Sequence, residues 1–119
     1  MTPTLIHGMI DYAVGAILIA APFLFGFDDG GVAQWATIAM GLIAIAYSLF
    51  TRYELGVIRI LPMRSHLGID LAFAVVLAAL PFLFGFADQV WLPHAVLGAA
   101  SLVVTSLTWA ALRAKPSRP

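Results

Sequence analysis

The sequence predicts an all-α, polytopic membrane protein with four transmembrane helices, built as two parallel helical-hairpin repeats. Hydrophobic residues make up 62% of the 119 residues and charged residues only 10%, whereas a soluble domain is about 45–50% apolar and about 25% charged. Four apolar stretches are long enough for a bilayer core, which needs about 20 residues per helix. The first and third stretches also share a polar pattern. This composition excludes a soluble globule, a disordered chain and a basic nucleic-acid binder.

The four spans form a single membrane domain over residues 1–119. They are predicted at residues 5–27, 32–50, 66–86 and 93–112. Residues 1–4 contain no Lys or Arg, so we expect the first span to be a retained helix and not a signal peptide. The polar connections 28–31 and 87–89 are short enough to join only antiparallel neighbours. No span alternates apolar and polar residues as a half-buried strand does.

The basic residues predict the orientation. All six lie between the second and third spans or after the fourth: Arg52, Arg59, Arg64, Arg113, Lys115 and Arg118. In a four-span protein these segments share one side with the N-terminus, and the other side carries Asp28, Asp29 and Asp88. The positive-inside rule therefore predicts that both termini face the cytoplasm.

Aromatic residues are expected to mark the two membrane interfaces. An outer belt would contain Trp35 and Trp91, and an inner belt Tyr12, Tyr47, Tyr53 and Trp109. The segment 52–65 mixes apolar residues with arginines, so we expect it to lie on the membrane surface, with the arginines near anionic headgroups.

A shift of 59 residues aligns the first span with the third. From position 3 to position 29, 14 of the 27 residues are identical without a gap. The shared landmarks are Pro3/Pro62, His7/His66, Asp11/Asp70 and the string Pro-Phe-Leu-Phe-Gly-Phe at 22–27 and 81–86. The second and fourth spans match only after a two-residue deletion, which places Gly41 on Gly98 and Thr51 on Thr108.

The chain therefore divides into repeat one (3–52), a cytoplasmic linker (53–61), repeat two (62–113) and a basic tail (114–119). Each repeat contains two spans, so both repeats enter the membrane from the same side. The pseudo-two-fold axis then runs along the membrane normal.

The strings at 21–27 and 80–86 resemble the motif of the SPW repeat family, which are small bacterial integral membrane proteins. At the positions of the family's serine and tryptophan this chain has Ala21 and Phe23, then Leu80 and Phe82. The resemblance covers nearly the whole chain as two units. It implies a bacterial cytoplasmic (inner) membrane and this architecture, and it brings no assigned biochemical activity with it.

The repeated string is interpreted as a helix terminator, because proline near a helix end removes a hydrogen bond and kinks the helix. A ligand-binding hinge is the alternative. The residues concerned are Pro22, Phe23, Gly26 and Phe27, with Pro81, Phe82, Gly85 and Phe86 in the second repeat.

A stripe of polar residues runs along the first helix of each repeat. His7 and Asp11 are four residues apart, and His66 and Asp70 repeat that spacing, so each pair lies on one helix face. Small residues follow each aspartate, at Gly15 and Ala74. We expect them to let the first and third helices approach closely and to bring the two pairs together near the cytoplasmic boundary.

Four interpretations of this stripe remain open. The pairs fix the packing of the two repeats, carry protons or ions, bind a metal such as Zn or Mn through two His and two Asp, or ligate haem through His7 and His66. His94 has only Thr37 as a counterpart in the repeat and is expected at the outer interface.

The sequence contains no catalytic motif: no phosphate-binding glycine loop, no nucleophile elbow and no H-E-x-x-H. With no cysteine, thiol chemistry is excluded as well. We therefore expect a structural or accessory protein and not an enzyme, with no cofactor. The alternative is a small proton-coupled transporter using Asp11 and Asp70, since small multidrug resistance proteins have similar length and span number. The expected partners are the lipid bilayer, with further copies of the chain or a larger membrane complex, and no nucleic acid.

Overall fold

The computed structural model describes residues 1–114, and in this part of the chain it contains four α-helices and no strand. They are α1 (Pro3–Leu24), α2 (Val32–Leu49), α3 (Met63–Leu83) and α4 (Leu92–Arg113). Each helix is 18 to 22 residues long and apolar enough to cross a membrane. The predicted all-α architecture with four spans is confirmed.

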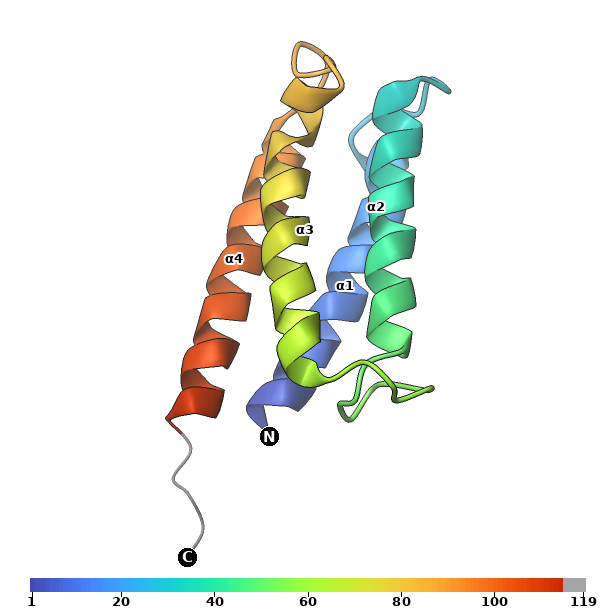
Figure 1. Ribbon diagram of the computed structural model, residues 1–119. Helices are drawn as coiled ribbons and strands as arrows, with labels where there is room; N and C mark the ends of the chain where they lie inside the picture. Colours follow the sequence, from blue (N-terminus) through green and yellow to red (C-terminus); the bar gives the residue numbers. More distant parts are fainter. Residues whose placement is uncertain (115–119) are drawn as a thin grey trace, which may run out of the picture.

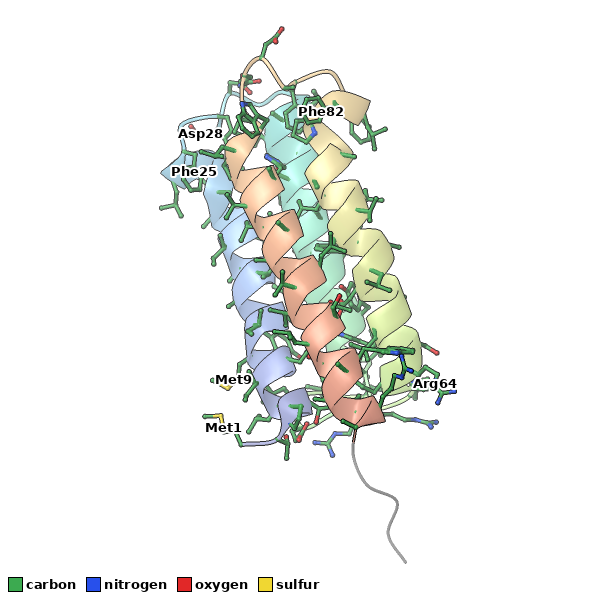
Figure 2. The ribbon with its side chains drawn as sticks, turned by 90° about the vertical axis from the view of Figure 1, so that its left-hand side faces the viewer. Met1, Met9, Phe25, Asp28, Arg64 and Phe82 are labelled. Carbon is green, nitrogen blue, oxygen red and sulfur yellow. The ribbon has the colours of Figure 1, made fainter. Side chains whose placement is uncertain are left out.

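The helices form an antiparallel bundle in which each repeat is one hairpin (Figure 1). Helix α1 packs along α2, and α3 along α4. Smaller contacts join α1 to α4 and α2 to α3. We call the end that carries the N-terminus and residues 50–62 the linker end, and the end with the connections 25–31 and 84–91 the hairpin end (Figures 1 and 2).

Among the described residues, α1 and α3 make no close backbone contact, because they lie across the bundle from each other. The expectation that Gly15 and Ala74 bring these two helices together is therefore wrong. A Cβ atom on Gly41 would lie 2.6 Å from the carbonyl oxygen of Gly15, and one on Gly98 2.9 Å from that of Ala74. The small residues thus serve the close packing of α1 on α2 and of α3 on α4.

The repeated Pro-Phe-Leu-Phe-Gly-Phe string ends the first helix of each repeat. Gly26 has a φ of +73°, and the N–H of Phe27 donates to the carbonyl of Pro22 at 2.8 Å. This is a Schellman motif, in which glycine adopts the left-handed conformation that other residues disfavour. The string at 81–86 forms the same turn, with a φ of +72° at its glycine. For this reason α1 and α3 end at Leu24 and Leu83, before the predicted ends at 27 and 86.

The linker is an ordered cap on α2. The N–H groups of Val57 and Ile58 donate to the carbonyl of Leu49 at 2.8 and 3.0 Å, and that of Leu61 donates to Phe50 at 2.7 Å. These bonds satisfy carbonyl groups that a helix C-terminus otherwise leaves without partners. The linker is therefore folded onto the bundle, while Val57 and Ile58 still expose apolar side chains.

The linker also holds the start of α1. Glu54 accepts hydrogen bonds from the hydroxyls of Thr2 and Thr4, the latter at 2.7 Å. Thr2 in turn caps α1 by accepting the N–H of Leu5 at 3.1 Å, the usual role of threonine at a helix N-cap. The linker end is thus closed by contacts between α1, the linker and α2.

Candidate functional site

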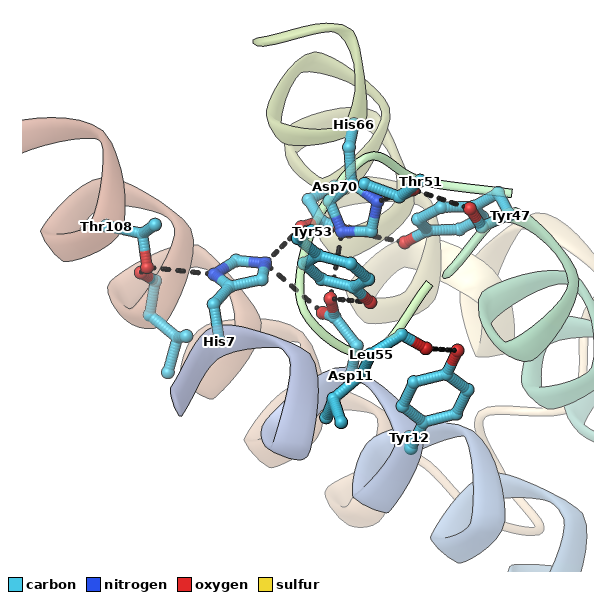
Figure 3. A network of polar contacts seen from close by, with 11 residues as sticks. His7, Asp11, Tyr12, Tyr47, Thr51, Tyr53, Leu55, His66, Asp70 and Thr108 are labelled. Atoms are coloured by element: carbon cyan, nitrogen blue, oxygen red, sulfur yellow. Dashed lines mark hydrogen bonds and ion pairs between the residues drawn. The ribbon is translucent and has the colours of Figure 1, made fainter. Parts of the chain in front are cut away.

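Both predicted His-Asp pairs meet in the middle of the bundle near the linker end (Figure 3). We call His7, Asp11, His66 and Asp70 the His–Asp centre. One nitrogen or oxygen atom from each of the four lies within 4.8 Å of the others. The convergence follows from the repeat, because equivalent positions on α1 and α3 face the same pseudo-two-fold axis.

The shortest contacts in the centre join one repeat to the other. His7 Nε2 lies 2.6 Å from Asp70 Oδ2, and His66 Nε2 lies 2.8 Å from Asp11 Oδ2. Contacts inside each repeat are longer: 3.2 Å from His7 to Asp11 and 3.1 Å from His66 to Asp70. Each imidazole therefore faces both carboxylates, and it lies closer to the carboxylate of the opposite repeat.

The centre is buried. The exposed fraction is 1% for His7, 0% for His66 and 4% for Asp70, and 12% for the Asp11 side chain. The adjoining cavity, lined in part by His7, Asp11 and Asp70, has a volume of about 20 Å³, which is enough for about one water molecule. At such burial each charge needs a partner, because an unpaired buried charge is strongly unfavourable.

A threonine on α4 fixes the ring of His7. Thr108 Oγ1 lies 2.8 Å from His7 Nδ1 and donates its own proton to the carbonyl of Val104 at 2.9 Å. A hydroxyl has one proton to donate, so Thr108 accepts from His7. His7 therefore donates from Nδ1, and its Nε2, 2.6 Å from Asp70 Oδ2, needs a second proton to donate to the carboxylates.

Thr51 plays the same part for His66. Its hydroxyl lies 2.6 Å from His66 Nδ1 and donates to the carbonyl of Tyr47 at 2.6 Å. Thr51 and Thr108 are the two positions that the repeat alignment superimposes. The duplication has thus preserved each histidine together with the hydroxyl that orients it.

Two tyrosines donate hydrogen bonds to the carboxylates. Tyr47 on α2 donates to Asp70 Oδ1, and Tyr53 in the linker donates to Asp11 Oδ2 at 3.0 Å. Burial and the neighbouring Asp11 carboxylate raise the pKa of the Tyr53 hydroxyl above its ordinary value, which keeps it a donor. The placement of these two tyrosines in an aromatic belt is wrong, because their hydroxyls face inward to the centre.

The family model of the SPW repeat domain matches residues 5–108. The chain belongs to the SPW repeat family. No curated protein and no solved structure matches it.

The strings that resemble the SPW motif lie at the hairpin end, where Figure 2 labels Phe25 and Phe82. The His–Asp centre lies near the opposite, linker end. At the hairpin end Phe27 and Phe86 are buried, with exposed fractions of 2% and 4%. Their rings lie 5.9 and 5.3 Å from the ring of His94. In this SPW protein the motif therefore serves helix termination and packing at the hairpin end.

His94 lies near the start of α4 at the hairpin end and is enclosed there by its neighbours. Its side chain is 0% exposed, and Nε2 lies 2.8 Å from the hydroxyl of Thr37. That hydroxyl donates to the carbonyl of Ala33 at 2.7 Å, so it accepts from His94. Within the described residues, His94 Nδ1 has no hydrogen-bond partner.

Sequence reasoning found the four residues of the His–Asp centre and missed the hydroxyl groups around it. The alignment of Thr51 on Thr108 was the available signal for the two threonines. No such signal exists for Tyr53, which has no repeat equivalent and reaches the centre only because the linker folds back. The role of the centre, among the interpretations left open above, remains a prediction.

Proposed function

We propose that this SPW repeat protein is a non-enzymatic structural or accessory membrane protein whose His–Asp centre holds its two repeats together. The contacts of 2.6 Å from His7 to Asp70 and 2.8 Å from His66 to Asp11 carry the proposal, because both cross between the repeats. Since α1 and α3 have no close backbone contact, these side chains link the two helices directly across the bundle.

The size of the central cavity supports a structural role. At about 20 Å³ it has no room for an organic substrate, since ligand pockets usually have volumes of about 300–1,000 Å³. A hydrophobic cation does not fit there either. Neither the fold nor the family comparison favours the transporter alternative.

Stability of the two-repeat unit tests this proposal. In Asp11→Leu/Asp70→Leu the donors of His7, His66 and both tyrosines lose their acceptors, and each buried unsatisfied group costs about 1–3 kcal/mol. We expect thermal unfolding in detergent at a much lower temperature than for the parent. The matched variant Asp11→Asn/Asp70→Asn keeps size and hydrogen-bonding groups and should melt closer to the parent. If the Leu variant melts with the parent, the proposal is wrong.

For the membrane location we propose a multi-pass protein of the bacterial inner membrane with both termini in the cytoplasm. The described basic residues support this, because Arg52, Arg59, Arg64 and Arg113 belong to segments at the linker end. Lys115 and Arg118 lie outside the described residues. Reporter fusions after Gly31 and Asp88 should report the outside, and a fusion after Arg59 the cytoplasm. A single reversed location contradicts the orientation.

For partners we propose further copies of the chain or a larger membrane complex, and no nucleic acid. The small chain with a filled centre supports a role in assembly more than in transport. Native mass spectrometry from a mild detergent should give a mass above the 12.7 kDa of one chain. A mass of a single chain under all solubilisation conditions contradicts assembly.

A further inference from the structure

We propose that the His–Asp centre binds one divalent transition-metal ion, with Zn²⁺ as the best match. The ligands are Nε2 of His7 and His66 and one carboxylate oxygen each from Asp11 and Asp70. The inference rests on the proposed function and deepens it, because an ion at this point bridges the same two repeats.

The donor set suits such an ion. Zn²⁺ takes four ligands from imidazole nitrogen, carboxylate oxygen and thiolate sulfur, usually in a tetrahedron. The centre offers two nitrogens and two carboxylates, with one ligand atom of each residue within 4.8 Å of the others. An oxygen-only ion such as Mg²⁺ demands octahedral geometry and keeps several waters, and the cavity of about 20 Å³ does not hold them.

The spacing of the ligand atoms is close to that of a tetrahedral site. Bonds of about 2.0–2.1 Å place the ligands of a tetrahedron about 3.3 Å apart. In the centre, Asp70 Oδ2 lies 2.6 and 3.1 Å from the two histidines, while Asp11 offers Oδ2 to His66 at 2.8 Å and Oδ1 to His7 at 3.2 Å. With one oxygen from each aspartate, all four ligand atoms lie within 4.8 Å of one another. An ion therefore requires the two shorter contacts to open by roughly half an ångström, which small side-chain rotations supply.

Each ligand residue also has a hydrogen bond to a neighbouring hydroxyl, at Nδ1 of each histidine, at Oδ1 of Asp70 and at Oδ2 of Asp11. Metal-binding histidines typically donate their second ring N–H to a neighbouring group, and ligating carboxylates accept a further hydrogen bond. Thr108 and Thr51 accept from the Nδ1 atoms of His7 and His66. Tyr47 and Tyr53 donate to Asp70 and Asp11. This complete outer layer is the second observation that points to a bound ion.

The charge of the centre agrees with a divalent ion. Without an ion, the 2.6 and 2.8 Å contacts need a proton on each Nε2 as well as on each Nδ1. Loss of the two Nε2 protons leaves neutral imidazoles whose lone pairs face inward beside two carboxylates. The inward face then has a charge of −2, which either two protons or one divalent cation neutralises. Binding is an exchange in which one M²⁺ enters and two protons leave, and no oxidant or reductant takes part.

Metal content of the purified protein tests the inference. The chain should carry an affinity tag without histidines, be stripped with a chelator in detergent, and then be dialysed against Zn²⁺. We expect one Zn²⁺ per chain, a higher melting temperature, and no comparable binding of Mg²⁺. With Co²⁺ the visible absorption of a tetrahedral site should appear. Absence of stoichiometric Zn²⁺ from folded parent protein overturns the proposal.

Matched variants assign the metal to the centre. His66→Ala should lose the ion, whereas His94→Ala, which removes the buried histidine of the hairpin end, should keep one Zn²⁺ per chain. Equal loss in both variants contradicts the site. If His66→Ala does not fold, Thr51→Val provides a second test, because it retains all four ligands. It should weaken Zn²⁺ binding about 10–100-fold, and unchanged affinity would contradict the orienting role.

The outcome is distinct from that of the stability test. Without Zn²⁺ binding, an unstable Asp11→Leu/Asp70→Leu variant still supports the link between repeats and overturns only the metal site. If Zn²⁺ binds and the Leu variant melts with the metal-free parent, the structural proposal falls and the metal site stands.

Discussion

Both ends of the bundle contain buried histidine, but the two ends differ in how many of the ring nitrogens have a partner. At the linker end His7 and His66 use both ring nitrogens, one toward a threonine and one toward two carboxylates. At the hairpin end His94 uses one nitrogen toward Thr37, and its other nitrogen has no partner among the described residues.

The difference depends on whether the two repeats have the same residue at equivalent positions. At the linker end every histidine has an equivalent in the other repeat, so two identical His-Asp-Thr sets meet around one axis. At the hairpin end His94 occupies the position equivalent to Thr37, and the two equivalent residues bind each other. Where both repeats keep the same polar residues, the bundle has a charged centre. Where the two repeats differ, at Thr37 and His94, it has a single neutral hydrogen bond.

Replacing one histidine at each end should show the largest difference. His66→Leu leaves Asp11 and Asp70 without one of their cationic or donor partners, and breaking a buried pair costs about 3–5 kcal/mol. His94→Leu removes one neutral hydrogen bond and a nitrogen without a partner, so we expect about 1 kcal/mol or less. Unfolding in detergent micelles measures both. Equal losses would mean that the two ends are not energetically different.

The two threonines should behave as a matched pair. Thr51→Val and Thr108→Val keep the side-chain shape and each leave one buried Nδ1–H without an acceptor, at about 1–3 kcal/mol. We expect nearly equal decreases in the free energy of unfolding. Thr37→Val at the hairpin end should cost less, because it faces the neutral His94. A large effect at only one of Thr51 and Thr108 would show that the centre is not symmetric in energy.

Alkaline pH should act on the linker end. The unfolded chain loses the Tyr53 proton above about pH 10, whereas burial and the Asp11 carboxylate raise the pKa of Tyr53 in the folded chain. Stability is therefore unaffected by this group below pH 10 and falls as pH rises above it. In Tyr53→Phe the decline above pH 10 should be shallower. An identical pH profile would show that loss of the Tyr53 proton does not cause the decrease in stability above pH 10.

Acid pH should act on the hairpin end, with the smallest effect. The Gly31 N–H, together with the Gln89 amide, holds the pKa of Asp29 below its usual range. The contribution of this exposed group is present above about pH 3.9 and is lost as the pH falls through the lower pKa of the folded chain. Asp29→Asn should slightly flatten the acid side of the stability curve. A steeper acid side in this variant would contradict the assignment.

Much of the fold was predictable because the duplication repeats distinctive polar residues within apolar helices. His7 and Asp11 align with His66 and Asp70 without a gap, which predicted both the parallel repeat and the meeting of the pairs. The neighbour of α1 was not predictable, since Gly15 marks a close helix contact without saying which helix makes it. Gly15 packs against α2, and α3 lies across the bundle.

The polar surroundings of the centre were harder to predict. Thr51 and Thr108 align only after a deletion, and a threonine near a helix end is common without any such role. Tyr53 depends on the linker, whose backbone bonds to Leu49 and Phe50 fold it onto α2. Contacts of this kind arise from tertiary structure, and no periodicity in the sequence encodes them.

A double-mutant cycle between His7 and Asp70 tests the central claim, that the pairs across the repeats hold the bundle together. His7→Leu, Asp70→Leu and the double variant are unfolded in detergent micelles with a chelator present. We expect an interaction energy of about 1–3 kcal/mol for this pair, and additivity within about 0.5 kcal/mol for His94 with Asp70. If the His7 and Asp70 losses are also additive, the contact across the repeats does not stabilise the fold and the account is wrong.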